Sequence, residues 1–295
     1  MKRWFYANGK RIGAFTLVFA LVLSLCFPGG LGSLLTALAD ESAAWDGTTA
    51  DSYAGGSGTK ADPYQIATAE QLARLVTATD TAGQYYKLTR NIRLNESGSS
   101  EPKQWVTSGS EKQKNVFQGY LEGNGYKISG LYIHVGEEGN EAYYAGLFNH
   151  LGDGTTIRNV GIVDADIAVN SAVTHEWGNT FAGTLAGIVD NASSVTIVGC
   201  YADESVSVTA RVVDSSFAGK SYNTGAGGFV GGAVGKDVTL LFNNCFFTGA
   251  LSCSLGDGAS AFCGNTYNPG MSIVNCYTIN NTVHRVSADS LKNVY

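Results

Sequence analysis

Residues 144–167 read YAGLFNHLGDGTTIRNVGIVDADI, and three variants of this unit follow it along the chain. The later copies are FAGTLAGIVDNASSVTIVGCYADESV (181–206), GAGGFVGGAVGKDVTLLFNNCFFTGAL (225–251) and GASAFCGNTYNPGMSIVNCYTINNTV (258–283). Each unit opens with small and apolar residues, followed by a turn, a β-branched strand, a polar corner and a second strand. Repeats of this kind predict a solenoid, in which stacked coils bury one another's apolar faces.

Alternation within the units indicates strands with one buried and one wet face. Val163, Ala165 and Ile167 are apolar, whereas Asp164 and Asp166 lie between them. A period of two is the signature of a half-buried strand. We therefore predict an all-β solenoid. An antiparallel β-sandwich is the alternative, because short strands with frequent turns suit both architectures.

One helix signal precedes the repeats. Thr68 can cap a helix and Gln71 can return the bond, as in a capping box. Leu72, Leu75 and Val76 then fall on one helical face. We expect this short N-terminal helix to cover the first coil, since the open end of a stack exposes strand edges.

The N-terminus has the three parts of a secretory signal. Four basic residues and no acid occupy positions 1–11, an apolar run covers 12–27, and Ala37-Leu38-Ala39 precedes Asp40. The apolar run is shorter than the roughly 20 residues of a spanning helix. We predict cleavage between Ala39 and Asp40, an extracellular or cell wall-associated protein, and no membrane span in the mature chain. An uncleaved anchor is the alternative.

Four segments follow from these signals: a signal peptide at 1–39, a flexible lead-in at 40–62, an N-terminal cap with the first coils at 63–140, and repeats at 141–295. The lead-in is small and polar and contains GGSG at 55–58. Because the chain stops at Tyr295 without a sorting motif or apolar tail, we expect the repeats to be truncated there.

Charge argues against nucleic acid as a partner. Removing the four basic residues of the leader from 19 leaves 15 basic and 25 acidic residues, a net charge of −10. An acidic exterior repels phosphate backbones and anionic lipids.

Five cysteines follow the leader, an odd number without the close pairs that zinc sites use. We interpret them as small buried hydrophobic residues. Cys200, Cys245 and Cys276 occupy one repeat position, and Gly161 is expected there in the first unit.

The unit openings Gly146-Leu147-Phe148 and Gly228-Phe229-Val230-Gly231, each followed by a strand and an Asn-Val-Gly or Asn-Cys-Phe corner, resemble the GLUG-motif repeats of bacterial surface proteins. The stretches GTKADPYQIATAEQLARL, YYKLTRNIRL and FQGYLEGNGYKISGL are similar to the region that precedes those repeats. The resemblance implies a right-handed parallel β-helix on secreted or wall-attached proteins. Such repeats occur in adhesin-like chains and upstream of the catalytic domain of zinc metallopeptidases that cleave immunoglobulin A.

No catalytic, cofactor-binding or metal-binding set is predicted. His175-Glu176 lacks the second histidine of H-E-x-x-H, because Asn179 stands in its place. Carboxylates from successive coils could form the groove of a carbohydrate-active enzyme, and a solvated acidic surface is the other interpretation. The candidate acids are Asp164, Asp166, Asp203, Glu204 and Asp214.

Aromatic residues in expected loops are candidates for stacking on sugar rings. They are Trp105, Tyr143, Tyr144 and Trp177. We therefore predict a secreted or cell-surface, adhesin-like binding scaffold without intrinsic catalysis, whose partner is a host or cell-surface glycan or protein. The alternatives are a non-catalytic N-terminal region of a larger surface enzyme, for example an immunoglobulin A-type zinc metallopeptidase, and a carbohydrate-active β-helix enzyme.

Overall fold

The computed structural model describes residues 41–106, 109–110, 115–136, 143–171, 179–190, 193–212, 223–253, 258–267, 270–279 and 291–294. The chain divides into two compact units, 1–41 and 42–295, and the second is described below. The predicted signal peptide, with Ala39 and Asp40, lies outside the described residues. In the described part, no helix has the length and apolar character needed to cross a membrane.

The strands form five ladders, named here I to V. Ladder I contains β1 (Tyr64–Ile66), β2 (Tyr85–Leu88), β6 (Tyr120–Glu122), β11 (Thr156–Arg158), β16 (Ser194–Val198), β21 (Thr239–Asn243), β26 (Gly270–Thr278) and β27 (Leu291–Val294). Ladder II contains β3 (Ile92–Arg93), β7 (Lys127–Ser129), β12 (Gly161–Val163), β17 (Tyr201–Ala202) and β22 (Phe246–Phe247), and the end of β26 joins it to ladder I.

The other three ladders are separate sheets. Ladder III contains β8 (Tyr132–Val135), β13 (Asp166–Ser171), β18 (Ser207–Val212) and β23 (Ala250–Cys253). Ladder IV contains β4 (Gly109–Ser110), β9 (Tyr143–Ala145), β14 (Asn179–Gly183), β19 (Asn223–Gly227) and β24 (Ala259–Ser260). Ladder V contains β5 (Val116–Phe117), β10 (Phe148–Leu151), β15 (Ala186–Asp190), β20 (Val230–Val234) and β25 (Cys263–Tyr267).

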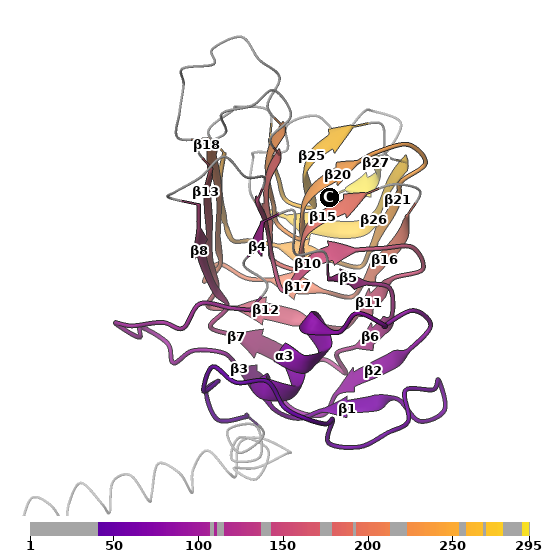
Figure 1. Ribbon diagram of the computed structural model, residues 1–295. Coiled ribbons are helices and arrows are strands. Elements are labelled where there is room, and N and C mark those ends of the chain that lie inside the picture. The colour runs from indigo at the N-terminus through magenta and orange to yellow at the C-terminus, as the bar shows by residue number, and fades with distance from the viewer. Residues whose placement is uncertain are drawn as a thin grey trace, which may run out of the picture. The chain divides into compact units, whose positions relative to one another are not determined.

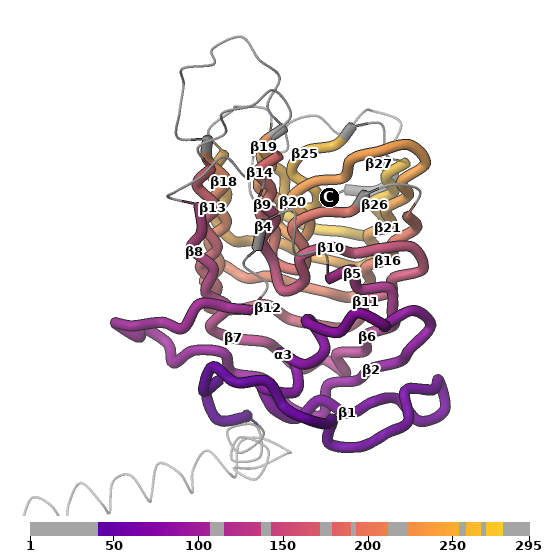
Figure 2. The backbone as a smooth tube through the Cα atoms, in the orientation of Figure 1, coloured from indigo at the N-terminus to yellow at the C-terminus, as the bar shows by residue number. Residues whose placement is uncertain are grey.

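From β11 to β21, each strand lies in parallel between the strand five places before it and the strand five places after it. Strand β11, for example, pairs with β6 and β16, and β13 pairs with β8 and β18. Figure 2 shows the result, because the colour changes from indigo toward yellow along the stacked strands. In the described part of the chain, antiparallel pairing is limited to β4–β9 and the Gly55–Gln65 bridge. This pattern fits a β-helix or solenoid-like fold and contradicts the antiparallel sandwich.

Apolar side chains align in columns because the coils are in register. The inward column of ladder I is fully or almost fully buried and consists of Tyr86, Leu121, Ile157, Ile197, Phe242 and Ile273. The matching column of ladder II consists of Ile92, Ile128, Ile162, Ala202 and Phe247. Burying each large side chain contributes about 1.5–3 kcal/mol, so every coil stabilises its neighbours through these columns.

A left-handed residue lies at each corner between ladders I and II from β6 onward, and Gly125 (φ 79°) is a second one at the first of these corners. The corner residues, with φ of 51–63°, are Asn124, Asn159, Gly199, Asn244 and Asn275. Glycine and asparagine tolerate this conformation better than other residues. The corners are also hydrogen-bonded between coils: Gly199 N–H donates to Asn243 O (2.9 Å) and Asn244 N–H donates to Val274 O (3.0 Å).

Glycines allow ladders IV and V to pack closely against each other. A Cβ on Gly231 would lie 2.5 Å from the backbone nitrogen of Ala182, and one on Gly187 would lie 2.5 Å from that of Ala145. Real side chains do not reach such distances, so the repeat openings require glycine here. The bends that join the two ladders bury one large apolar residue in each coil: Leu147, Leu185, Phe229 and Phe262.

The predicted helix is present as α3 (Ala69–Thr77), at the indigo end of the ladders (Figure 1). Thr68 Oγ1 accepts a bond from Gln71 N–H (3.3 Å). The Gln71 side chain accepts from Ala67 N–H (2.8 Å), one residue earlier than the capping box predicts. The buried face of the helix joins the main core and comprises Ala69, Leu72, Ala73, Leu75 and Val76.

Part of the expected lead-in, residues 41–62, packs against the first coils. Trp45 is buried and its ring meets that of Trp105 edge-on, with 5.0 Å between centroids. Ala50 N–H donates to the carbonyl of Glu70 in α3 (3.0 Å). Trp45 and Ala50 therefore attach this segment to the rest of the fold.

The aromatic residues expected in exposed loops are placed differently. Trp105 is fully buried, and its Nε1–H donates to Leu147 O (3.1 Å). Tyr144 is buried in a small second cluster and Tyr143 is half-buried, whereas Trp177 lies outside the described residues. The prediction of exposed stacking platforms at Trp105 and Tyr144 is wrong.

The cysteine column is real but its first member is not Gly161. Gly161 pairs with Tyr201, which places Val160 beside Cys200. The column is buried and consists of Val160, Cys200, Cys245 and Cys276. Burial raises the pKa of the Cys200 thiol to about 12, so this side chain stays protonated and packs as a hydrophobic residue.

We predict that the corner residue Asn244 can be replaced by glycine but not by alanine. Residue 244 has φ 53°, and alanine lacks the short polar side chain that lets asparagine adopt this left-handed conformation. Asn244→Ala is therefore expected to lower the free energy of unfolding by about 1–2 kcal/mol. Asn244→Gly reproduces the residue that the chain uses at Gly199 and is expected to be neutral within about 0.5 kcal/mol. Urea unfolding of both variants measures the difference. Equal stabilities would contradict the left-handed corner.

Candidate functional site

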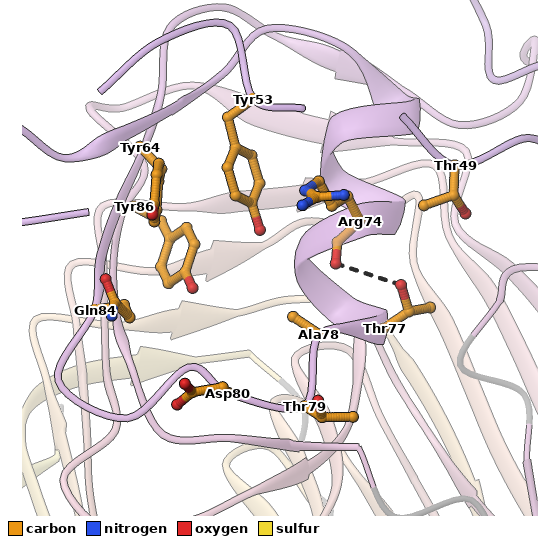
Figure 3. Close-up of a pocket in the computed structure, with 10 residues that line it drawn as sticks. All are labelled: Thr49, Tyr53, Tyr64, Arg74, Thr77, Ala78, Thr79, Asp80, Gln84 and Tyr86. Atoms are coloured by element: carbon orange, nitrogen blue, oxygen red, sulfur yellow. Dashed lines mark hydrogen bonds between the residues drawn. The ribbon is translucent and has the colours of Figure 1, made fainter. Parts of the chain in front are cut away.

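A cavity of about 460 Å³ opens where the C-terminal end of α3 faces the lead-in, β1 and β2 (Figure 3). Five separate segments contribute to its walls, so it depends on the packed cap described above. Its lining is Thr49, Tyr53, Tyr64, Arg74, Thr77, Ala78, Thr79, Asp80, Gln84 and Tyr86. We call it the tyrosine pocket.

Three tyrosines form one wall of the tyrosine pocket. The Tyr53 ring lies 4.7 Å from that of Tyr64 and 5.6 Å from that of Tyr86, and Tyr64 lies 5.5 Å from Tyr86. Aromatic pairs at these separations attract one another beyond their buried area. Figure 3 shows the hydroxyl ends of Tyr53 and Tyr86 directed into the pocket. The wall is therefore rigid and carries phenol hydroxyls toward the cavity.

Arg74 supplies the cation of the tyrosine pocket. Its guanidinium carbon lies 5.4 Å from the centre of the Tyr53 ring, and Nη1 donates to Ala50 O (3.3 Å). Among the described residues, no carboxylate lies within the 4 Å ion-pair distance of Arg74. The guanidinium is thus positioned by the ring and hydroxyl of Tyr53 and by one backbone carbonyl, and it lines the pocket.

Gly58 explains the shape of the tyrosine pocket. Its φ is +78°, and a Cβ there would lie 2.3 Å from both Gln84 Oε1 and the Tyr64 ring. Its carbonyl accepts a bond from Tyr85 N–H (2.9 Å), which anchors the GGSG segment to β2. The GGSG segment therefore supports a wall of the tyrosine pocket.

Burial shifts the titration of the pocket phenols. It raises the pKa of Tyr53, which neighbouring Arg74 partly offsets, and it raises the pKa of Tyr86 well above the usual range of tyrosine. Both phenols are therefore neutral hydrogen-bonding groups at physiological pH. Hydroxyls, an amide and one cation suit the binding of a polar ligand.

A second cavity of about 380 Å³ lies beside the start of ladder III. His134 Nε2 lies 2.9 Å from Asp166 Oδ2, and the His134 ring stacks on Tyr132 with 4.3 Å between centroids. We call it the His–Asp pocket. Its lining is Asn95, Glu96, Gly98, Ser99, Pro102, Gly130, Leu131, Tyr132, His134, Asp164 and Asp166.

The structure brings together only two of the five acids considered from the sequence. Asp164 and Asp166 both line the His–Asp pocket, although Asp164 has φ 51° and forms a corner rather than part of strand β13. Asp203 and Glu204 are absent from its lining, and Asp203 accepts bonds from Ser205 instead. Asp214 lies outside the described residues, as do His175 and Glu176.

In the described ranges, no group of three or more His, Cys, Asp or Glu side chains is arranged to hold a metal ion. Sequence reasoning considered the acids of the His–Asp pocket but not His134, which comes from the preceding coil. It missed the tyrosine pocket entirely, because the residues of that pocket follow no known motif.

No family model matches this chain. A protein of Evansella cellulosilytica named "Putative Gly-rich membrane protein" is 33% identical over 141 residues, which are 48% of this chain and 15% of that protein. "Halomucin" of Haloquadratum walsbyi is 30% identical over 154 residues, 50% of this chain and 2% of that protein. The chain therefore spans only a small part of these relatives' lengths.

One solved structure is also similar. It is described as a "putative immunoglobulin A1 protease" from Bacteroides ovatus, and the match covers 77% of this chain and 78% of that one. The sequence identity is 18% and the TM-score is 0.39.

We predict that Tyr86 makes the folded state sensitive to alkali. Unfolded tyrosine ionises near pH 10, whereas folded Tyr86 keeps its proton, so unfolding is favoured as the pH rises above 10. Each such tyrosine lowers the free energy of unfolding by up to about 1.4 kcal/mol per pH unit. Urea unfolding between pH 9 and 11 is expected to show a shallower loss for Tyr86→Phe than for the wild type. Parallel pH profiles would contradict the burial of a neutral phenol.

Proposed function

We propose that this chain is an adhesin-like binding scaffold of a secreted or cell-surface protein, built on a closed, right-handed β-helix of GLUG-type repeats and without catalysis of its own. The observation that carries the proposal is the in-register pairing of strands five places apart, with two polar pockets on the first coils. Such a stack is stiff and gives a large lateral surface. Glycans or proteins of a host or of cell surfaces are the partners that we propose.

The relatives support a place within a larger protein. Their names refer to a membrane protein and to halomucin, and the matched segments are 15% and 2% of those proteins. A segment that recurs in long chains of this kind is expected to act as a module. The leader-like sequence at 1–39 supports export of the module.

A second possibility within this proposal is that the repeats precede a catalytic domain, as the GLUG resemblance implies for zinc metallopeptidases. The solenoid would then position or recognise the substrate rather than react with it. Its own pockets would keep the same binding role, because neither contains a three-residue metal site in the described ranges.

The His–Asp pocket gives a specific reason to consider carbohydrate chemistry. A histidine held 2.9 Å from a carboxylate can act as a general base, and such catalysis contributes about 10²–10⁴-fold to a rate. Under the scaffold proposal, the wild type releases no reducing ends or unsaturated products from a panel of neutral and acidic polysaccharides. Cleavage that Asp166→Asn reduces by about 100-fold would instead establish the enzyme. Asp62→Asn, an exposed position outside this pocket, is the matched control.

Export is tested at the predicted cleavage site. Expression of the full chain in a bacterium with general secretion is expected to give a mature protein that begins at Asp40, as read by N-terminal sequencing. Ala39→Leu replaces the small residue that the peptidase requires and is expected to leave the leader attached. Leu38→Ala is the control and is expected to be cleaved normally. A wild-type protein that keeps Met1 and remains inside the cell would contradict the proposal.

A further inference from the structure

We propose that the tyrosine pocket is a binding site for an acidic sugar, a pyranose that carries a carboxylate, such as a hexuronate or a sialate. This inference rests on the proposed function in that it assigns the glycan-binding role to one site. The argument starts from Arg74, because the charge of that residue selects the class of ligand.

Arg74 lies in the last turn of α3, where a cation interacts favourably with the helix dipole. Its guanidinium carbon is held over the Tyr53 ring, and its donors bond to Ala50 O and to the Tyr53 side chain, which leaves further N–H donors of its five for a ligand. No carboxylate among the described residues lies within ion-pair distance of it. A planar guanidinium held in this way matches a carboxylate in the bidentate manner.

The rest of the pocket suits a polyol. Tyr53 and Tyr86 present neutral hydroxyls, because burial raises the pKa of both phenols. Gln84 adds an amide with donors and an acceptor, and exposed Asp80 adds a carboxylate that can accept two hydroxyl protons. Donors and acceptors in this mixture match the adjacent hydroxyls of a sugar ring.

The volume of the cavity and the contacts of the Tyr53 ring narrow the class of ligand further. A cavity of about 460 Å³ lies within the range of small-molecule sites, about 300–1,000 Å³. Arg74 and Tyr64 both already contact the Tyr53 ring, which reduces the aromatic surface that a flat ligand could use. A compact ligand with one carboxylate and several hydroxyls therefore complements the lining better than an aromatic or purely apolar one.

The test uses the exported chain and three probes measured by isothermal titration: methyl β-glucuronide, methyl α-sialoside and neutral methyl β-glucoside. At least one acidic glycoside is expected to bind 10-fold or more tightly than the glucoside. Arg74→Met keeps the stem on Tyr53 and is expected to remove that preference. Arg158→Met removes a cation from ladder I, outside the pocket, and is expected to leave binding unchanged.

Asp80→Asn is a second variant, for the case in which Arg74→Met fails to fold. Because Asp80 is exposed, this substitution is expected to leave the fold intact. It removes an acceptor for sugar hydroxyls and a negative charge beside the bound carboxylate, so the ratio of affinities for the acidic over the neutral glycoside is expected to rise while thermal unfolding stays unchanged. Equal affinity for acidic and neutral probes, no binding of any probe, or equal competition by inorganic sulfate would each overturn the acidic-sugar site. The export test at Ala39 reads out independently, so failure of this site and failure of the surface role are distinguishable.

Discussion

In-register parallel hydrogen bonding between each strand and the strands five places away is the constraint on which the other features depend. A shift of one residue would move every apolar side chain of a strand to the wet face. The corner between ladders I and II prevents such a shift. One left-handed residue lies between β11 and β12, and another lies between β16 and β17. Two residues separate the strands at this corner in each coil from β11–β12 to β21–β22, even where the loops on other faces differ between repeats.

The same register explains why the repeats are rich in glycine. Ladders IV and V lie so close that their backbones occupy the space of side chains at Gly187 and Gly231. A residue with a Cβ at either position would have to move a whole strand, and in-register pairing would transmit that movement to the coils on both sides. Because glycine has no side chain to fill the core, the apolar side chains of the bend residues Leu147 and Phe229 occupy that space.

Periodicity was sufficient to predict the strands, the stacking and the capping helix. The helix is capped by Thr68 and buries the face that contains Leu72 and Leu75, as its sequence indicates. Alignment of the repeat motifs alone placed Gly161, instead of Val160, as the first member of the cysteine column. Both residues fit a small-residue position, and only the strand register shows which one lies beside Cys200. Trp105 was unpredictable for a related reason: it lies in a polar stretch, but a partner carbonyl from Leu147 lets its indole be buried.

The tyrosine pocket could not be read from the sequence because its residues are brought together by the end of the repeat pattern rather than by the pattern itself. Inside the stack, a side chain such as Ile157 must match its counterparts in the coils above and below, which leaves little freedom for polar chemistry. Tyr53 and Arg74 belong to the cap, where the lead-in and α3 take the place of a preceding coil. There a cation and neutral phenols can converge without breaking a column. The residues that pack over the first coils are thus also the residues of the proposed binding site.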